Sequence, residues 1–432
     1  MQIRNKLQPL PEKNHTGTAI ICRVCIILSL FFILQSCNFA DLKKDLQDMN
    51  RHAVIRGEIT FQTEEENNAP CIIAAFDSEN RLIKYKLIQP DTNYYVMQLP
   101  DSEIYKLSVF QDINRDSAYQ LSEPAAFWIN PQSAKLEKNN PLVINFSLSP
   151  KTILPEYLQI NPADSKLFTG TSFKIITGEK TDLNHFQFSR EYGTLGLWKP
   201  FEAFRKYGVG VYFTEDYNPE KIPVLFVYGM GGYAGDWKTI FNSIDRTKFQ
   251  PWFYFYPSGY SINASAKALN IIMNNLKKKY KFNKLFIIAH SMGGLVAHKF
   301  ISLSRPRNKK HFIRLFISIS TPWGGDKDAE WGQKAPATIP CWNDIVPSSN
   351  FIKNTKASAL EGIPYYLLFT YKGDRKPFRI NNDTTISIAS QLKMDFQLKA
   401  EKVYGFNDHH AEILNDITTI DIINSILDKY KK

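Results

Sequence analysis

The chain of 432 residues lacks the motifs that most often mark a zinc enzyme or a disulfide-rich protein. Beyond residue 36 it has no Cys-x-x-Cys pair, and nowhere does it have a His-Glu-x-x-His motif, so the common zinc-ligand spacings are absent. Of its five cysteines, Cys22, Cys25 and Cys37 belong to a predicted leader and its cleavage site, which leaves Cys71 and Cys341. Two thiols exclude a framework of disulfides and leave at most a single bridge.

The chain also lacks a dense cluster of basic residues. Its 53 Lys and Arg residues exceed its 42 Asp and Glu residues and give a net charge of +11. Acids lie among the lysines, and the tight basic runs are short, at Lys277–Lys279 and Lys309–Lys310. This pattern argues against a nucleic-acid partner. With 44% apolar residues and room for two or three domains of about 150 residues, the chain is expected to bury a full core.

No apolar run is long enough to cross a bilayer as a helix, which takes about 20 residues. The run Val24–Leu34 is shorter and follows a basic segment, which is typical of a secretory signal peptide. Leu34–Cys37 resembles a bacterial lipobox. The resemblance implies a signal peptide over 1–36, diacylation of Cys37, a tether over 37–52 and, because Asn38 follows, sorting to the outer membrane facing the periplasm. An uncleaved N-terminal anchor is the alternative, and both predict a protein held in the cell envelope.

Residues 53–150 show a rhythm of short strands. Alternating or continuous apolar stretches are separated by clusters of Asn, Asp, Pro and Glu, without a helical period. The stretches are Val54–Phe61, Cys71–Phe76, Tyr94–Leu99, Tyr105–Phe110 and Leu142–Leu148. Evenly spaced strands of this kind predict a β-sandwich, and the rhythm resembles the prealbumin-like modules found on secreted hydrolases.

A candidate metal site lies inside this predicted sandwich. Asp112, Asn114, Asp116 and Glu123 stand at relative positions 1, 3, 5 and 12, the spacing of oxygen ligands in an EF-hand calcium loop. Ser117 occupies the place that favours glycine in that loop, and the flanking segments are predicted strands rather than helices. The sequence therefore leaves two alternatives, a structural calcium site and an Asx-rich turn.

The pattern changes after a predicted connector at 151–207. Gly208–Phe213 predicts an aromatic-rich hairpin, and from Pro223 onward buried strands alternate with helices. The predicted strands are Val224–Tyr228, Trp252–Tyr256, Leu285–Ala289, Leu315–Ser320, Tyr365–Thr370 and Lys402–Gly405. Ala264–Tyr280 has a helical period, with apolar residues on one face and lysines opposite. This alternation predicts an α/β fold over 208–432, with a mostly parallel sheet flanked by helices.

Ser291 is the candidate nucleophile. It lies in Ala289–Gly293, directly after the apolar run Leu285–Ile288 and before a helix-like segment. Small residues beside a serine allow the strained strand–turn–helix geometry that lifts a hydroxyl clear of a sheet. The usual pattern is Gly-x-Ser-x-Gly, and Ala289 is small enough for the first place. The alternative is an ordinary turn that carries an exposed serine.

A glycine-rich turn, Gly229–Gly232, follows the first long strand of this region. Glycines there let the backbone N–H of Met230 point into a site, where it and the N–H of Met292 would form a two-donor oxyanion hole. The same turn also matches a loose dinucleotide-binding fingerprint. The next strand ends without the carboxylate that would bind a ribose, so the oxyanion turn is favoured.

These features together resemble the lipases and esterases of the α/β-hydrolase family, from about Gly208 to the C-terminus. The family usually has His-Gly at the oxyanion turn, and Tyr228 stands at the place of that histidine. Thr321–Gly325 and the insertion at 323–360 resemble the lid of a group of lipase-like bacterial hydrolases. The aromatic residues of this insertion are expected either to cover an acyl pocket or to pack under a long loop; they include Trp331, Trp342 and Phe351.

In this family the triad follows the chain order serine, acid, histidine. Only His409 and His410 follow the predicted strand Tyr365–Thr370. The residues after His410 resemble the family's histidine loop, so His410 is the predicted base and His409 the reserve. The segment around Asp383 resembles the one that carries the acid in lipases, and Asp374, nearer the strand, is the alternative.

The sequence therefore predicts a membrane-tethered serine hydrolase that cleaves carboxylic esters through an acyl-enzyme. Asp383 would orient His410, which takes the proton of Ser291 as the hydroxyl attacks an acyl carbon. This chemistry needs no cofactor, and the expected partners are an ester or lipid substrate and a membrane. An acyltransferase with the same triad and a catalytically inactive envelope scaffold are the alternatives. The sequence carries no signal for an oligomeric state.

Overall fold

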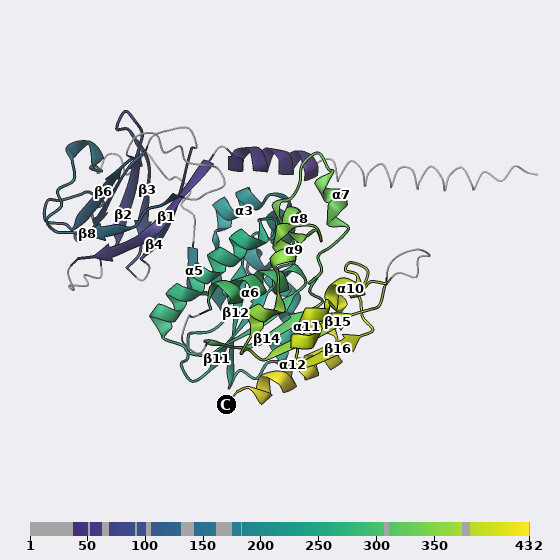
Figure 1. Cartoon of the computed structure of the whole chain (residues 1–432). Coiled ribbons are helices and arrows are strands. Elements are labelled where there is room, and N and C mark those ends of the chain that lie inside the picture. The colour runs from purple at the N-terminus through teal and green to yellow at the C-terminus, as the bar shows by residue number, and fades with distance from the viewer. Residues whose placement is uncertain are drawn as a thin grey trace, which may run out of the picture.

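The computed structural model contains a large α/β body, a small β body and a long helix beside them (Figure 1). It describes residues 38–50, 52–62, 69–90, 93–100, 105–130, 142–160, 175–182, 184–305, 311–373 and 381–431. The predicted leader with Cys37, and the alternative acid Asp374, lie outside the described residues. Cys71 and Cys341 are both buried free thiols, so no bridge joins them.

An eight-stranded sheet forms the centre of the large body. Neighbouring strands are parallel except for one antiparallel pair, β10 with β12. In spatial order the strands are β16 (Lys402–Phe406), β15 (Tyr365–Thr370), β14 (Ile313–Ile319), β13 (Leu285–His290), β11 (Ile222–Val227), β12 (Phe249–Phe255), β10 (Val209–Phe213) and β9 (Ile175–Lys180). The central strands are continuous apolar runs because helices cover both faces. All six strands predicted from Pro223 onward are present, but β16 is mostly exposed and not buried as predicted, because it lies at the edge of the sheet.

Helices cover the two faces of this sheet with separate apolar cores. On one face lie α5 (Ile262–Tyr280) and α6 (Met292–Leu303), and on the other α4 (Lys238–Ser243) and α12 (Ile417–Lys429). Shorter helices follow β14 and β15; these are α7 (Ala329–Gln333), α8 (Pro340–Ile345), α9 (Asn350–Asn354), α10 (Ile388–Gln391) and α11 (Met394–Lys399). The large body has the α/β-hydrolase fold that the sequence predicts.

The start of the large body differs from the prediction. Gly208–Phe213 does not form a hairpin, because its strand β10 pairs with β9 and with β12, neither of which is joined to it by a tight turn. Strand β9 lies in the predicted connector, as do α2 (Arg190–Trp198) and α3 (Pro200–Tyr207). The sheet therefore recruits residues well before 208.

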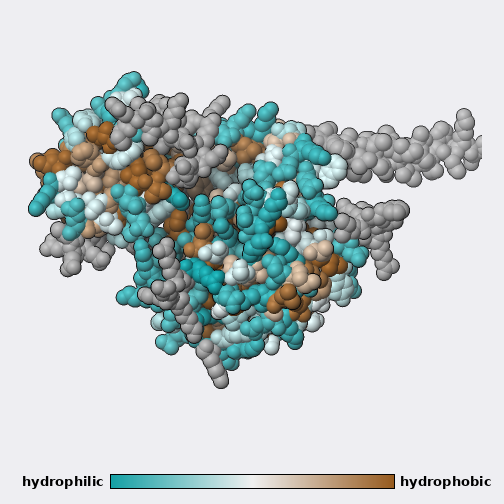
Figure 2. Space-filling view, viewed as in Figure 1, coloured by the Kyte–Doolittle hydropathy of each residue, from teal (hydrophilic) through white to brown (hydrophobic). Residues whose placement is uncertain are grey.

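The small body consists of two four-stranded sheets. One contains β4 (Tyr94–Pro100), β1 (His52–Phe61), β7 (Leu142–Val143) and β8 (Phe146–Leu148), and the other contains β3 (Leu82–Ile88), β2 (Cys71–Phe76), β5 (Lys106–Gln111) and β6 (Ala125–Ile129). Buried side chains from both sheets belong to one apolar cluster. Figure 2 shows apolar residues gathered on the visible face of this small body. Its likeness to a prealbumin-like module stays a prediction.

Residues 38–50, expected to be part of a tether, form a helix that packs on the large body. Leu42 is fully buried in the core that also contains α5 and α6. The carboxylate of Asp45 accepts the backbone N–H groups of Phe201 and Glu202 at 2.8 and 2.7 Å. These N–H groups lie in the first turn of α3, where a helix has no acceptors of its own. The segment is therefore a docked helix rather than a free linker.

Within the part of the chain that the structure describes, no helix is both long and apolar enough to cross a membrane.

Candidate active site

Ser291 lies at a sharp turn between β13 and α6. Its backbone adopts φ 54° and ψ −133°, a strained combination for a residue with a side chain. Two residues later, a Cβ on Gly293 would lie 2.4 Å from the carbonyl oxygens of Val227 and Tyr228, so only glycine fits there. Ala289, at the place of the first glycine, is fully buried within β13. The elbow predicted from the sequence is therefore present, with alanine accommodated inside the strand.

The hydroxyl of Ser291 begins a chain of hydrogen bonds through three side chains. Its Oγ lies 2.8 Å from Nε2 of His410, and Nδ1 of His410 lies 2.7 Å from Oδ2 of Asp383. The carboxylate accepts the Nδ1 proton, which leaves Nε2 free to accept from the serine. Ser291 and His410 are each 9% exposed, and Asp383 is fully buried. The arrangement can remove a proton from the serine as the hydroxyl attacks an acyl carbon.

Asp383 is held by four donors in addition to His410. Its Oδ2 accepts the hydroxyl of Thr370 at 2.6 Å and Nε2 of Gln391 at 3.0 Å, and its Oδ1 accepts the backbone N–H groups of Ile386 and Thr385 at 2.7 and 3.1 Å. Burial raises the pKa of this carboxyl, but the bonds from His410, Thr370 and the backbone outweigh burial and hold the pKa below its ordinary value. The acid therefore stays ionised beside the histidine.

The neighbouring histidine does not enter this chain of bonds. His409 is directed to the surface side of the loop, where its Nδ1 donates to the carbonyl of Lys372 at 2.7 Å. The backbone N–H of His410 donates to the carbonyl of Asp383 at 2.9 Å, which ties the histidine loop to the acid loop. Of the two candidates, the structure brings only His410 to Ser291.

His290 is a site residue that the sequence reasoning missed. Its Nε2–H donates to the backbone carbonyl of His410 at 2.8 Å, and the two rings lie 4.9 Å apart. Burial, followed by the proximity of His410, lowers the pKa of His290 to about 3, so its ring is neutral at ordinary pH. His290 therefore joins the elbow to the loop that carries His410. The sequence offered one signal for a role of His290 in the site, namely its position directly before Ser291.

The glycine-rich turn lies against the nucleophile. A Cβ on Gly229 would stand 2.7 Å from Cβ of Ser291, so the backbone of this turn approaches the serine closely. Met292 is the first residue of α6, where an N–H has no acceptor within its own helix. No hydrogen bond of the Met230 N–H is found among the described residues. Both predicted oxyanion donors therefore belong to the segments that flank Ser291.

Tyr228, directly before this turn, is hydrogen-bonded to Tyr256. Its hydroxyl donates to the carbonyl of Tyr256 at 2.5 Å and accepts the N–H of the same residue at 2.8 Å. The hydroxyl of Tyr256 donates in return to the carbonyl of Tyr228 at 2.7 Å, and the rings stack 4.8 Å apart. Gly231 adds a bond from its N–H to Oγ of Ser258 at 2.9 Å. Tyr228 thus ties the glycine-rich turn to the end of β12.

The aromatic residues of the insertion have three different environments. The indole Nε1 of Trp342 donates to Sδ of Met230 at 3.1 Å, so α8 contacts the side chain of an oxyanion residue. Trp331 in α7 is 73% exposed, and Phe351 in α9 is partly buried against the core. The insertion therefore contacts the glycine-rich turn through α8, while Trp331 is exposed to solvent.

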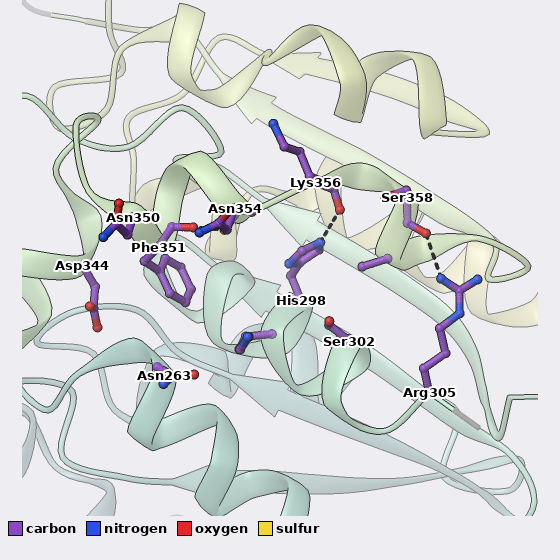
Figure 3. Close-up of a pocket in the computed structure, with 13 residues that line it drawn as sticks. Asn263, His298, Ser302, Arg305, Asp344, Asn350, Phe351, Asn354, Lys356 and Ser358 are labelled. Atoms are coloured by element: carbon purple, nitrogen blue, oxygen red, sulfur yellow. Dashed lines mark hydrogen bonds between the residues drawn. The ribbon is translucent and has the colours of Figure 1, made fainter. Parts of the chain in front are cut away.

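A cavity of about 580 Å³ lies between α6 and the segment from α8 to the 3-10 helix at Ala357–Leu360, and none of the triad residues lines it (Figure 3). At its base, Nε2 of the buried His298 donates to the carbonyl of Lys356 at 2.9 Å, and Arg305 donates to the carbonyl of Ser358 at 3.0 Å. Both side chains therefore donate to backbone carbonyls at the end of the insertion. The cavity is separate from the candidate active site.

The predicted calcium ligands make a turn instead of a cage. Asp112 accepts the N–H groups of Asp116 and Ser117 at 3.1 and 3.2 Å, and Glu123 accepts those of Ile113 and Gln120 at 2.7 and 3.0 Å. Asp116 accepts the side-chain amide of Asn114 at 3.0 Å. No group of three or more His, Cys, Asp or Glu residues is arranged to hold a metal ion in the described ranges. The residues fit the Asx-rich turn that the sequence left as the alternative.

Comparison with known families agrees with the α/β-hydrolase fold of the large body. Residues 258–356, which include the elbow, match the model of a family described as "Alpha/beta hydrolase of unknown function (DUF915)". No curated protein sequence matches the chain significantly.

The solved structures that match the chain are distant in sequence. The lin2722 gene product of Listeria innocua is 15% identical, with a TM-score of 0.38, and the match covers 49% of this chain and 96% of that one. The mature lipase BlEst2 of Bacillus licheniformis is 13% identical, with a TM-score of 0.36, and the match covers 49% of this chain and 94% of that one. Phospholipase PlaB of Legionella pneumophila is 14% identical, with a TM-score of 0.33, over 40% of this chain and 45% of that one.

Proposed function

We propose that the chain is a serine hydrolase that cleaves carboxylic esters through an acyl-enzyme. The observation that carries the proposal is the unbroken chain of hydrogen bonds from Ser291 through His410 to Asp383 at 2.8 and 2.7 Å. A strained elbow and a glycine-rich turn on either side of the serine supply the rest of the acyl-transfer machinery. An ordinary surface serine has none of these neighbours.

The proposed reaction has two halves. Oγ of Ser291 attacks the acyl carbon while Nε2 of His410 takes the hydroxyl proton, and the N–H groups of Met230 and Met292 donate to the oxyanion. The tetrahedral intermediate collapses, His410 gives its proton to the leaving alkoxide, and an acyl-serine remains. Water then attacks the acyl-serine with the same base, which releases the acid and restores the hydroxyl.

We also propose that the hydrolase is tethered to a membrane of the cell envelope through lipid on Cys37. The support is the signal-peptide pattern and the lipobox-like sequence that precede the first described residue. Cys37→Ser should abolish incorporation of labelled palmitate, and equal incorporation by that variant would refute the tether. With the tether, the expected location is the outer membrane, facing the periplasm.

Turnover of p-nitrophenyl esters of increasing acyl length tests the activity directly. Hydrolysis that disappears in Ser291→Ala supports the proposal, and the preferred chain length separates an esterase from a lipase. A wild-type protein that neither hydrolyses any of these esters nor reacts with a fluorophosphonate probe would contradict it and favour the inactive scaffold.

A further inference from the structure

The helix at 38–50 connects the predicted lipid attachment to the large body without a flexible linker. Asp45 binds the first turn of α3, Leu42 enters the core, and Asp41 pairs with Lys199 at 2.9 Å. An extended tether over 37–52 would reach on the order of 50 Å and leave the body free to turn. The docked helix removes that freedom, because its first residue lies at a defined place on the large body.

That place is near the insertion whose helix α8 contacts Met230 of the glycine-rich turn. Phe39 packs edge-on against Trp198 of α2, with ring centroids 5.3 Å apart. Trp198 in turn packs edge-on against Trp342 of α8, with centroids 6.1 Å apart. Gly332 of α7 lies so close to the ring of Trp342 that a Cβ there would clash at 2.1 Å. Two ring contacts therefore separate the start of the chain's described part from α8, and α7 packs directly on α8.

Helix α7 presents the exposed aromatic of this region. Trp331 is 73% exposed, and Nζ of Lys334 lies 4.9 Å from the centre of its ring. A tryptophan with an apolar body and a polar N–H, beside a lysine, is typical of a surface at the boundary between water and lipid. The large exposed tryptophan has no role in the core of the insertion, whereas Trp342 does.

We infer that the α7 face, defined as Trp331 and the exposed residues of Ala329–Gln333 around it, rests on the lipid bilayer. The inference rests on the membrane tether of the proposed function. Cys37 is one Cα–Cα step of about 3.8 Å from residue 38, so acyl chains on it enter the bilayer next to Phe39. A rigid helix then holds α7 and α8 toward the lipid. In this orientation an ester carried by a lipid of the same leaflet reaches the protein on the side where Trp342 contacts Met230.

The test uses the full chain, isolated from membranes and reconstituted in phosphatidylethanolamine–phosphatidylglycerol vesicles with or without brominated acyl chains. Bromine quenches tryptophan fluorescence only at short range. Trp331→Phe removes the proposed reporter, and Leu398→Trp and Leu121→Trp place new ones on other exposed apolar sites of α11 and the small body, where the native side chains are 79% and 69% exposed. Ester hydrolysis in detergent is measured for every variant.

The expected result is bromine-dependent quenching in the wild type that is mostly lost in Trp331→Phe and not increased in Leu398→Trp or Leu121→Trp. Equal quenching of the wild type and Trp331→Phe would overturn the inference, and so would new quenching in either added-tryptophan variant, because the bilayer would then touch another face. A chain that stays in solution also overturns it. Hydrolysis in detergent is independent of these outcomes, so failure of the orientation is distinguishable from failure of the proposed activity.

Discussion

Nε2 of His410 lies 2.8 Å from Oγ of Ser291, although 119 residues separate the two in the chain. The approach depends on two neighbouring loops at the carboxyl ends of the strands. The elbow supplies Ser291 and, through His290, a bond to the backbone of His410. The acid loop supplies the carboxylate of Asp383 and accepts the N–H of His410. His410 is thus held at both its ring and its backbone.

Replacing Ser291 by alanine should abolish turnover while the fold remains intact. Alanine retains the backbone of the elbow and removes the only atom that attacks the substrate, so kcat should fall by on the order of 10⁴ or more. Hydrolysis of p-nitrophenyl butyrate and thermal melting measure the two effects. Ser302→Ala, an exposed serine of the same helix α6, is the matched control and should keep full activity. Substantial turnover by Ser291→Ala would place the nucleophile elsewhere.

The two adjacent histidines provide an internal comparison. His410→Ala should lose activity about as completely as Ser291→Ala, because members of a triad act as a unit. His409→Ala removes only a surface bond to the carbonyl of Lys372 and should remain active. Assay of both variants under identical conditions decides the assignment. The opposite result, an active His410→Ala and an inactive His409→Ala, would show that the base is one residue earlier.

His290→Phe should lower kcat on the order of 10- to 100-fold and leave KM nearly unchanged, because it removes the bond that positions the loop of the base. The ring fills the same space and lacks only the N–H donor. His298→Phe is the matched control, since His298 is also a buried histidine of this region and also donates to a backbone carbonyl, that of Lys356, away from the triad. With a pKa of about 3, His290 adds no ionisation to the rate profile above pH 4. An unchanged kcat in His290→Phe would mean that His290 contributes only to packing and that its hydrogen bond does not affect catalysis.

Asp383 should make the stability of the large body depend on acid pH. Its folded-state pKa lies below the ordinary value of 3.8, so its contribution is complete above that value and is lost as the pH falls through the lower folded value. Asp383→Asn should therefore lower the melting temperature at neutral pH and flatten its decline in acid. Melting from pH 7 to pH 2 measures both curves. Parallel curves for the two proteins would mean that the carboxylate gives no pH-linked stability.

The loop from Asp112 to Glu123 should be indifferent to calcium. Its carboxylates already accept backbone N–H groups, so EGTA should leave the melting temperature unchanged. Asp112→Ala should destabilise the small body by about 1–3 kcal/mol, because two backbone donors lose a buried acceptor. Calorimetry with calcium and with EGTA on both proteins distinguishes the cases. A rise with calcium in the wild type that is absent in Asp112→Ala would restore the metal site.

Local patterns were sufficient for much of the larger body. Continuous apolar runs predicted β11 to β15, because a strand covered on both faces has to be apolar throughout. Strand β16, at the edge of the sheet, is mostly exposed. The elbow was predictable for a similar reason, since the residues around Ser291 meet steric demands that only small side chains satisfy. The start of the body was not predictable in this way. Strand β9 has a mixed burial pattern and is defined by pairing with β10, about 34 residues further on.

The helix at 38–50 illustrates the same limit. The lipobox resemblance implied a tether there, and the buried members of the helix are few, chiefly Leu42 and Asp45. In the sequence, Asp45 has nothing to distinguish it from a solvated residue of a linker. Only the tertiary structure shows that its carboxylate accepts two N–H groups of α3. Such pairing between distant segments leaves no period in the sequence.

The sequence by itself determined the class of fold, the strands from β11 onward and the candidate nucleophile Ser291, because these depend on residue size, polarity and spacing over a few positions. It narrowed the base to His409 and His410 and the acid to two aspartates, and chain order alone leaves such pairs unresolved. The tertiary structure decided that His410 faces Ser291, that Asp383 reaches His410 and that His290 supports the loop of the base. These choices depend on side-chain direction, and direction is set by packing between segments that lie far apart in the chain.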